Sequence, residues 1–206
     1  MPLKPSLMVF RHFIQGQALE MCIRDSLLCC RQKGVYSVGW YVLHCKSGQE
    51  EAIIRSCKHH LSKPALDDAF QFSYERMKKY LGEWHVDTYR MFPDYVFLQS
   101  SRPELLLKEL KQYRDITDVL AQEDMLLPVQ PEEEAMIRTL CGERHHMGLS
   151  RGLVRNGSFR AVNGPLAGKE ALIRKLDLHK RIAVLNLKPV KENKDIWAGI
   201  EILPGE

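Results

Sequence analysis

The sequence has no long apolar run and no paired cysteines at the spacing of a zinc site. None of its apolar runs approaches the roughly 18–20 residues that a membrane-spanning helix needs, so we expect no membrane partner. Charged residues and glutamines at 11–25 interrupt any apolar segment near the start, which argues against a signal peptide. The cysteines lack both the spacing of a zinc site and the density of a secreted disulfide scaffold. We therefore expect reduced thiols in a cytoplasmic protein. The cysteines are Cys22, Cys29, Cys30, Cys45, Cys57 and Cys141.

The histidines show no metal-binding or catalytic motif. His59-His60 and His145-His146 are adjacent pairs, and adjacent side chains on a helix diverge by about 100°, without a spaced third ligand. We expect no metal and no cofactor. Cys141 with His145 or His146 could form a nucleophile and base, but no oxyanion-stabilising motif accompanies them. A cysteine-dependent enzyme is therefore an alternative, and a protein that is not an enzyme is our prediction.

Charge is divided unevenly along the chain. Residues 40–143 carry 13 Lys and Arg against 18 Asp and Glu, whereas residues 144–206 carry 12 against 6. A basic part joined to an acidic part indicates that the C-terminal part faces a polyanion, of which nucleic acid is the first candidate. An ordinary solvated basic face is the alternative.

Residues 1–39 differ from the rest of the chain because they show neither a strand period nor a helix period. Within them, Met21–Ser26 (MCIRDS) resembles the translation of a transposon adapter used in preparing sequencing libraries. We interpret residues 1–39 as an artefactual or disordered extension and leave them out of the fold prediction. A genuine extension is the alternative.

Residues 40–143 predict an α+β domain. Strand formers at 40–45 precede a helix at about 50–61, which is acidic at its start and basic at its end as the helix dipole prefers. A hairpin is predicted around Leu81-Gly82-Glu83. In the strand at 95–98 both faces are apolar, so the second face is either covered by another element or open to a partner.

The rest of this domain is predicted to be mainly helical. Ser101–Glu104 reads as a capping box with proline in the first turn, and it begins a helix through LLLKELKQY. Val119-Leu120 is a short strand at best, and EEEAMIRTLCG forms a second helix closed by Gly142. The predicted order β-α-β-β-α-β-α is typical of an α+β sandwich.

The C-terminal part is predicted to contain a linker and a small barrel. Residues 144–158 combine glycines and arginines without an acid or a period, so they indicate a mobile basic linker. From Phe159 on, short strands alternate with turns, as in a small β-barrel filled by its own side chains. In the strand at 171–176, alternation predicts that Arg174 and Lys175 face opposite ways.

Three ordered motifs resemble the NusG family of transcription elongation factors. They are Trp40-Tyr41-Val42, Phe92–Phe97 (FPDYVF) and Val162–Gly168 (VNGPLAG). The resemblance spans about residues 40–203 and implies an NGN domain at 40–143, an α/β sandwich with an antiparallel sheet and flanking helices, followed by a KOW β-barrel at 159–206. Within the family, the runs at 147–152 and 173–187 look most like LoaP, a specialised antiterminator paralogue.

The resemblance also implies partners. The NGN domain would dock on the clamp helices of RNA polymerase through Phe92, Pro93, Tyr95 and Phe97. Without the resemblance, packing in the core is the expected role of these rings, as it is for Trp40. Asp94 replaces the family's more usual glycine, and aspartate tolerates a left-handed backbone.

The KOW domain of the LoaP-like branch would bind a hairpin in the nascent RNA. Gly164, Pro165 and Gly168 match the family's turn. The RNA-binding candidates follow from charge and placement instead, because no strict family motif covers them. These candidates are Lys169, Arg174, Lys175, His179, Lys180 and Arg181.

We therefore predict a monomeric transcription antitermination or elongation factor. The nearest alternative is a general NusG-type factor whose KOW domain binds a protein, such as a ribosomal protein or a termination factor.

Overall fold

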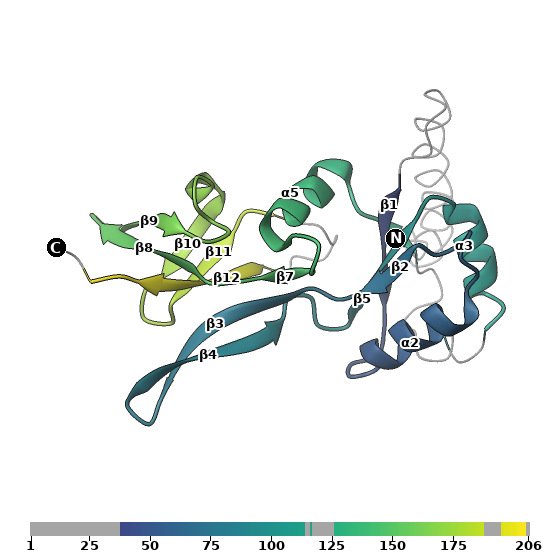
Figure 1. Ribbon diagram of the computed structural model, residues 1–206, viewed down its shortest axis with the longest axis horizontal. Coiled ribbons are helices and arrows are strands. Elements are labelled where there is room, and N and C mark those ends of the chain that lie inside the picture. Colours follow the sequence, from purple (N-terminus) through teal and green to yellow (C-terminus); the bar gives the residue numbers. More distant parts are fainter. Residues whose placement is uncertain (1–37, 114–115, 117–125, 188–194, 205–206) are drawn as a thin grey trace, which may run out of the picture. The chain divides into compact units, whose positions relative to one another are not determined.

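The computed structural model describes residues 38–113, 116, 126–187 and 195–204. From Gly39 on, they belong to one compact unit of mixed α/β structure with three sheets (Figure 1). The predicted extension lies outside the described residues as far as residue 37, and so does the short strand predicted at Val119-Leu120. None of the helices among the described residues is long and apolar enough to cross a membrane.

The first sheet has four strands in the order β2-β5-β1-β6. They are β1 (Gly39–His44), β2 (Asp68–Phe70), β5 (Tyr95–Ser100) and β6 (Leu127–Pro128). Strand β5 lies antiparallel between β1 and β2, with Val42 opposite Phe97. This central position explains why β5 is apolar on both faces.

Helices cover both faces of this sheet (Figure 1). On one face, α2 (Glu50–His60) and α3 (Pro103–Leu110) enclose a core that includes Leu43, Val96 and Leu98. On the other face, α5 (Pro131–Cys141) packs into a second core that includes Trp40, Val42 and Phe97. Both faces of β5 are therefore covered within the described chain.

The start of α3 differs from the prediction. The helix begins at Pro103 as expected, but Arg102 occupies the N-cap and makes no side-chain capping hydrogen bond. Instead, the Ser100 hydroxyl oxygen accepts a hydrogen bond from the Arg102 amide at 3.0 Å. The predicted capping box is therefore wrong, although the first-turn proline is where it was expected.

The predicted hairpin is confirmed. Strands β3 (Ser73–Tyr80) and β4 (Glu83–Arg90) pair along their whole length and leave a two-residue turn at Leu81-Gly82. Both turn residues are left-handed, with φ of 54° and 84°, as the hairpin turn that fits strand twist requires. With β7 (His146–Met147), which pairs parallel to β3, the hairpin forms a three-stranded sheet. The predicted strand order is wrong here, because four strands, β2 to β5, separate α2 from α3.

The third sheet has five strands in the order β10-β11-β12-β8-β9. Its strands are β8 (Ser150–Arg155), β9 (Ser158–Asn163), β10 (Ile173–Asp177), β11 (Ile182–Leu185) and β12 (Ile196–Ile202), and a short 3-10 helix (Glu170–Leu172) precedes β10. Alternate residues of β11 and β12, including Ala183, Leu185 and Ala198, face a shared core. The last strand pairs parallel with β8, and the other neighbours are antiparallel.

The predicted linker contains regular structure. Within residues 144–158, β7 and β8 are strands, so the segment is not irregular as the sequence suggested. The glycines of this segment suggested a linker, but Gly152 has another role. A Cβ at Gly152 would overlap the Arg160 carbonyl on β9. That glycine allows close strand pairing instead of flexibility.

The three-stranded and five-stranded sheets meet through backbone contact. A Cβ on Gly199 in β12 would overlap the Glu75 carbonyl oxygen in β3, so only glycine fits between them. The Glu75 carboxylate accepts the Leu149 amide at 2.9 Å on the same side.

Candidate functional site

The loop from Phe92 to Tyr95 connects β4 to β5 and contains the FPDY motif. The Tyr95 amide donates to the Phe92 carbonyl at 3.3 Å, and the Cys45 amide donates to the Asp94 carbonyl at 2.9 Å. Asp94 has a φ of 72°. Aspartate therefore adopts the left-handed conformation that the sequence suggested it could tolerate in place of glycine.

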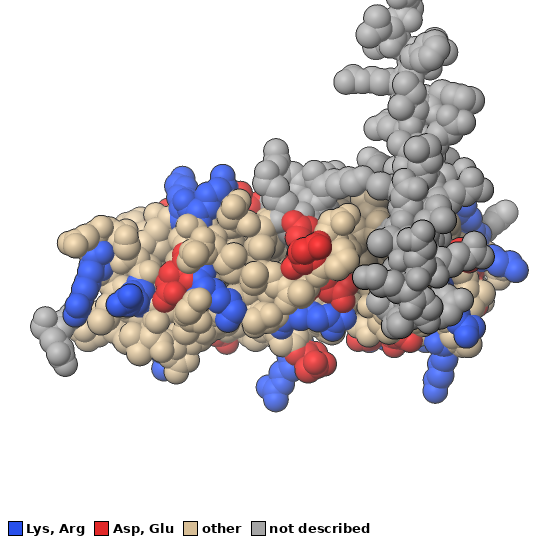
Figure 2. Space-filling model, turned by 90° about the horizontal axis from the view of Figure 1, so that it is seen from above, with Lys and Arg blue, Asp and Glu red and all other residues tan. Residues whose placement is uncertain are grey.

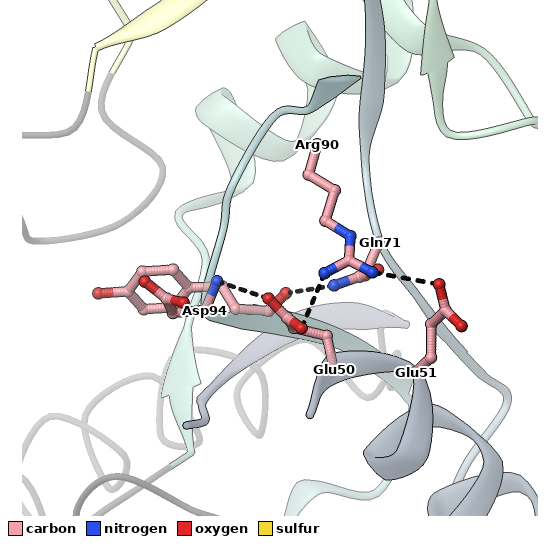
Figure 3. Close-up of polar contacts among 6 residues, drawn as sticks. Glu50, Glu51, Gln71, Arg90 and Asp94 are labelled. Atoms are coloured by element: carbon pink, nitrogen blue, oxygen red, sulfur yellow. Dashed lines mark hydrogen bonds and ion pairs between the residues drawn. The ribbon is translucent and has the colours of Figure 1, made fainter. Parts of the chain in front are cut away.

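A buried carboxylate ties this loop to the start of α2 (Figure 3). Glu50 is 1% exposed, and it accepts the Asp94 amide at 3.1 Å and the Arg90 guanidinium at 2.9 Å. The other arm of Arg90 reaches Glu51 at 3.1 Å. A buried carboxylate needs such partners, because leaving it unpaired would cost several kcal/mol. Glu50 therefore fixes the position of the loop.

The aromatic residues of the motif are buried. Phe92 is 3% exposed, Tyr95 2% and Phe97 0%, whereas Pro93 is exposed. The Phe92 ring lies 5.9 Å from Phe72 and 5.2 Å from Phe97, and the Tyr95 ring stacks on His44 at 4.8 Å. In this conformation the rings do not form the open surface expected of docking residues. Pro93 is the member of the motif that a partner can reach, and the docking role itself stays a prediction.

Trp40 has the core role predicted for it. The indole is 1% exposed and packs edge-on against Phe70 at 5.4 Å. The Arg138 guanidinium lies 4.2 Å from the ring centroid. Such a contact stabilises a cation against the ring face and links α5 to β1.

The glycine-rich turn forms at residues 164–168. Gly164 has a φ of 98°, and a Cβ there would overlap the Leu149 carbonyl oxygen. The Gly164 carbonyl accepts the Ala167 amide at 3.1 Å, and the Ser150 hydroxyl accepts the Leu166 amide at 3.0 Å. Leu166 is fully buried, so the turn is anchored to the core of the five-stranded sheet.

A β-bulge changes the predicted orientation of two basic residues. Ile173 pairs with Leu185 and Lys175 with Val184, so Arg174 is an extra residue on β10. Arg174 and Lys175 are both exposed, while Ile173 and Leu176 pack against the core. The prediction that the two cations face opposite ways is wrong, because a bulge re-aims one side chain.

The remaining basic candidates lie in and near the turn between β10 and β11. His179 and Lys180 are exposed, and Lys180 is held by Asp177, which accepts its amide at 2.9 Å. Arg181 has a φ of 53°, and its guanidinium lies 4.9 Å from the Trp84 ring on β4. Lys169 is half-buried after the Gly168 turn.

The candidate cations are therefore partly engaged within the protein. Arg174 forms an ion pair with Asp195, and Lys180 approaches the Asp177 carboxylate at 3.9 Å. On the face shown in Figure 2, basic side chains over the five-stranded sheet lie at separate places with an acidic group between them. The structure thus places Arg174 and Lys175 on one strand, and His179, Lys180 and Arg181 in the turn that follows it.

Cys141 and the two histidines near it in sequence are placed unfavourably for catalysis. Cys141 is 5% exposed, and burial raises the pKa of its thiol to about 12, so the nucleophilic thiolate is scarce at neutral pH. His145 stacks on Phe70 at 3.5 Å, and His146 contacts the Ser73 hydroxyl at 2.8 Å. The described part of the chain holds no group of three histidine, cysteine, aspartate or glutamate side chains able to bind a metal.

Comparison with known proteins gives a family match in the first part of the chain. Residues 39–138 match the family model NusG, described as "Transcription termination factor nusG". This segment is therefore similar to the NusG family domain. It contains the FPDY loop, Glu50 and Arg90, so the loop described above lies within the matched domain.

Comparisons with curated proteins and with solved structures gave different results. No curated protein matches the chain. Among solved structures, a similar chain is that of "Domain interaction in Thermotoga maritima NusG", with 14% sequence identity and a TM-score of 0.45, covering 81% of this chain and 94% of that one.

Three residues of these surfaces were not singled out by the sequence. Glu50 looked like an ordinary first-turn acid of α2, and its partner Arg90 lies 40 residues away. The sequence places Trp84 in the hairpin but does not show that the Arg181 guanidinium packs against its ring. Trp197 is 41% exposed on β12, and the odd positions of this strand, read against its buried neighbours, could have indicated an outward side chain.

Proposed function

We propose that this chain is a transcription elongation or antitermination factor of the NusG family, which binds RNA polymerase through residues 40–143 and structured nascent RNA through its C-terminal sheet. The match of residues 39–138 to the NusG model carries the proposal. The charge division supports it, because the acidic part contains the family domain and the basic part contains the exposed cations.

For the polymerase contact, we propose the FPDY loop. Pro93 is its exposed residue, and the buried rings of Phe92, Tyr95 and Phe97 support it from beneath. Glu50 and Arg90 then hold the loop against α2 in one orientation. The clamp helices of the polymerase are the surface that the family resemblance implies.

For the RNA contact, we propose the cations of β10 and of the following turn. Lys175 and His179 are exposed, and Arg174 is turned outward by the bulge. Phosphate binding by such side chains releases counterions, so affinity should fall as salt rises. We also propose that the five-stranded sheet closes as the KOW barrel and that a monomer acts in the cytoplasm, in the manner of a LoaP-like antiterminator.

A gel shift with the full chain tests the RNA contact. Wild-type protein should bind a stem–loop RNA from the gene's own leader, and the slope of log affinity against log salt should decrease by about 1 in Lys175→Gln. Lys111→Gln is the control. It removes an exposed cation at the C-terminal end of α3, outside the five-stranded sheet, and should leave the slope unchanged. Absence of salt-sensitive binding by the wild type would instead favour a protein partner for this sheet.

A pull-down with core RNA polymerase tests the other contact. Pro93→Asp should weaken co-purification, because it places a charge at the exposed position of the loop without removing a buried ring. Undiminished co-purification of this variant would remove the FPDY loop from the polymerase interface.

A further inference from the structure

The three tryptophans of the chain lie in different surroundings. Trp40 is buried against the four-stranded sheet, and one face of Trp84 is occupied by the Arg181 guanidinium. Trp197 is 41% exposed, and within the described ranges no ring or cation packs against it. A single exposed apolar residue is ordinary on a protein surface, so the surroundings of Trp197 decide its meaning.

Trp197 belongs to a row of side chains that crosses three strands. It pairs with Val184 on β11, and Val184 pairs with Lys175 on β10. Residues paired directly across strands share a face, so the indole and the Lys175 amine project from the same side of the sheet. Their Cα atoms lie two strand spacings apart, or about 10 Å.

The β-bulge adds a second cation to this face. Arg174 and Lys175 are both exposed, and Arg174 forms an ion pair with Asp195, which lies just before β12 and two residues before Trp197. Val184, at 8% exposure, is the low floor between the indole and Lys175. The exposed Trp197 ring therefore lies beside the nearly buried Val184 side chain, and the two cations lie on the far side of Val184.

This combination fits an unpaired nucleotide. Single-stranded nucleic acid is held by aromatic rings that stack on bases and by cations that follow the phosphates. A base inside a duplex cannot stack on a protein ring, so loops and bulges are the parts of a folded RNA that use such rings. The net positive charge beside the ring favours an anionic occupant over an apolar one, and an unpaired nucleotide is the anionic occupant that also supplies a base to stack on the ring.

We propose that Trp197 is a base-stacking residue, which accepts one unpaired RNA base while Lys175 and Arg174 hold the neighbouring phosphates. The inference rests on the proposed function, because it names the part of the RNA that the C-terminal sheet recognises. Trp197 adds an aromatic ring to the proposed RNA-binding surface, which its basic side chains alone had defined. It also distinguishes recognition of a loop from attraction to any polyanion.

The test compares two RNA probes with the full chain. One is a stem–loop with an adenine-rich unpaired loop, and the other is a blunt duplex of the same stem. Trp197→Ala should weaken binding of the stem–loop by roughly 5- to 150-fold, the range typical of removing one stacking ring, and should change duplex binding less than twofold. Trp197→Phe should recover most of the lost affinity, because it restores a stacking surface.

The matched control is Tyr80→Ala, which removes a ring of nearly the same exposure, 42%, from the β3–β4 hairpin. It should bind both probes like the wild type. Unfolding midpoints of all variants show whether each is folded. Where Trp197→Ala is unstable, Trp197→Leu, which keeps apolar bulk without a ring, takes its place and should also lose stem–loop affinity.

The outcomes separate the two proposals. Stem–loop binding that is equal in wild type and in the folded variant without a ring, Trp197→Ala or Trp197→Leu, overturns the stacking role and leaves RNA binding intact. An equal loss on both probes also overturns it, because stacking requires an unpaired base. A wild-type chain that binds neither probe overturns the proposed RNA function itself.

Discussion

Replacing Glu50 tests whether one buried carboxylate holds the FPDY loop. In Glu50→Gln the side-chain oxygen can still accept the Asp94 amide, but the amide group meets the Arg90 guanidinium as donor against donor. The variant therefore loses one hydrogen bond between charged groups, which contributes about 1.5–3 kcal/mol. Arg90 keeps Glu51 as a partner and is partly solvated, so the loss should stay near the middle of that range.

Urea unfolding measures this loss. A decrease of about 2 kcal/mol with a slope near 2 kcal/mol per M lowers the midpoint by about 1 M. Glu51→Gln is the matched control, because Glu51 binds the same guanidinium but its side chain is 68% exposed. Exposed ion pairs contribute at most about 1 kcal/mol, so the control should shift far less. Equal midpoints for the two variants would refute the anchoring role of Glu50.

Two further predictions concern the aromatic core. Phe92→Ala should lower the free energy of unfolding by about 3–5 kcal/mol, because it removes a buried ring. Pro93→Ala should change it by less than about 1 kcal/mol, because Pro93 is exposed. Similar urea midpoints for the two variants would contradict the burial of Phe92. Burial lowers the pKa of His145, so between that pKa and the ordinary value of 6.5 the unfolded chain binds the proton first and stability should decrease as pH falls. Thermal unfolding from pH 7.5 to 5 should show a smaller decrease in His145→Gln than in the wild type, and parallel curves would exclude His145 as the source.

Local patterns in the sequence predicted several elements correctly. The Leu81-Gly82 turn was readable because Gly82 readily adopts the left-handed conformation that a tight hairpin requires. The helices α2 and α5 were readable from their acidic first turns and apolar spacing. These signals act within a few residues, so no distant contact was needed to recognise them.

Features that depend on distant contacts were not predictable in the same way. The sequence left the second face of β5 either covered or open, and the choice is made by α5, Phe70 and Phe72, which are remote in sequence. The bulge at Arg174 depends on the register against β11, which alternation alone does not report. The segment at 144–158 looked like a linker because the hydrogen bonds that order β8 come from β9 and β12.

The candidate site was predicted in its residue types more than in its geometry. Gly164 and Gly168 adopt the left-handed turn conformation, as the motif suggested. The cations at Arg174, Lys175 and His179 are exposed, but Arg174 also binds Asp195. Side-chain pairing of this kind follows from the fold and could not be read from charge counts.

Transcription in vitro tests the central claim most directly. A template carrying the gene's own leader followed by a terminator is transcribed by purified RNA polymerase, with and without the full chain, and read-through is measured. We predict that the wild-type chain raises read-through and that it loses this effect when the unpaired loop of the leader hairpin is replaced by a paired stem. Read-through that stays unchanged at every concentration of the chain, with an active polymerase, would contradict the proposed function.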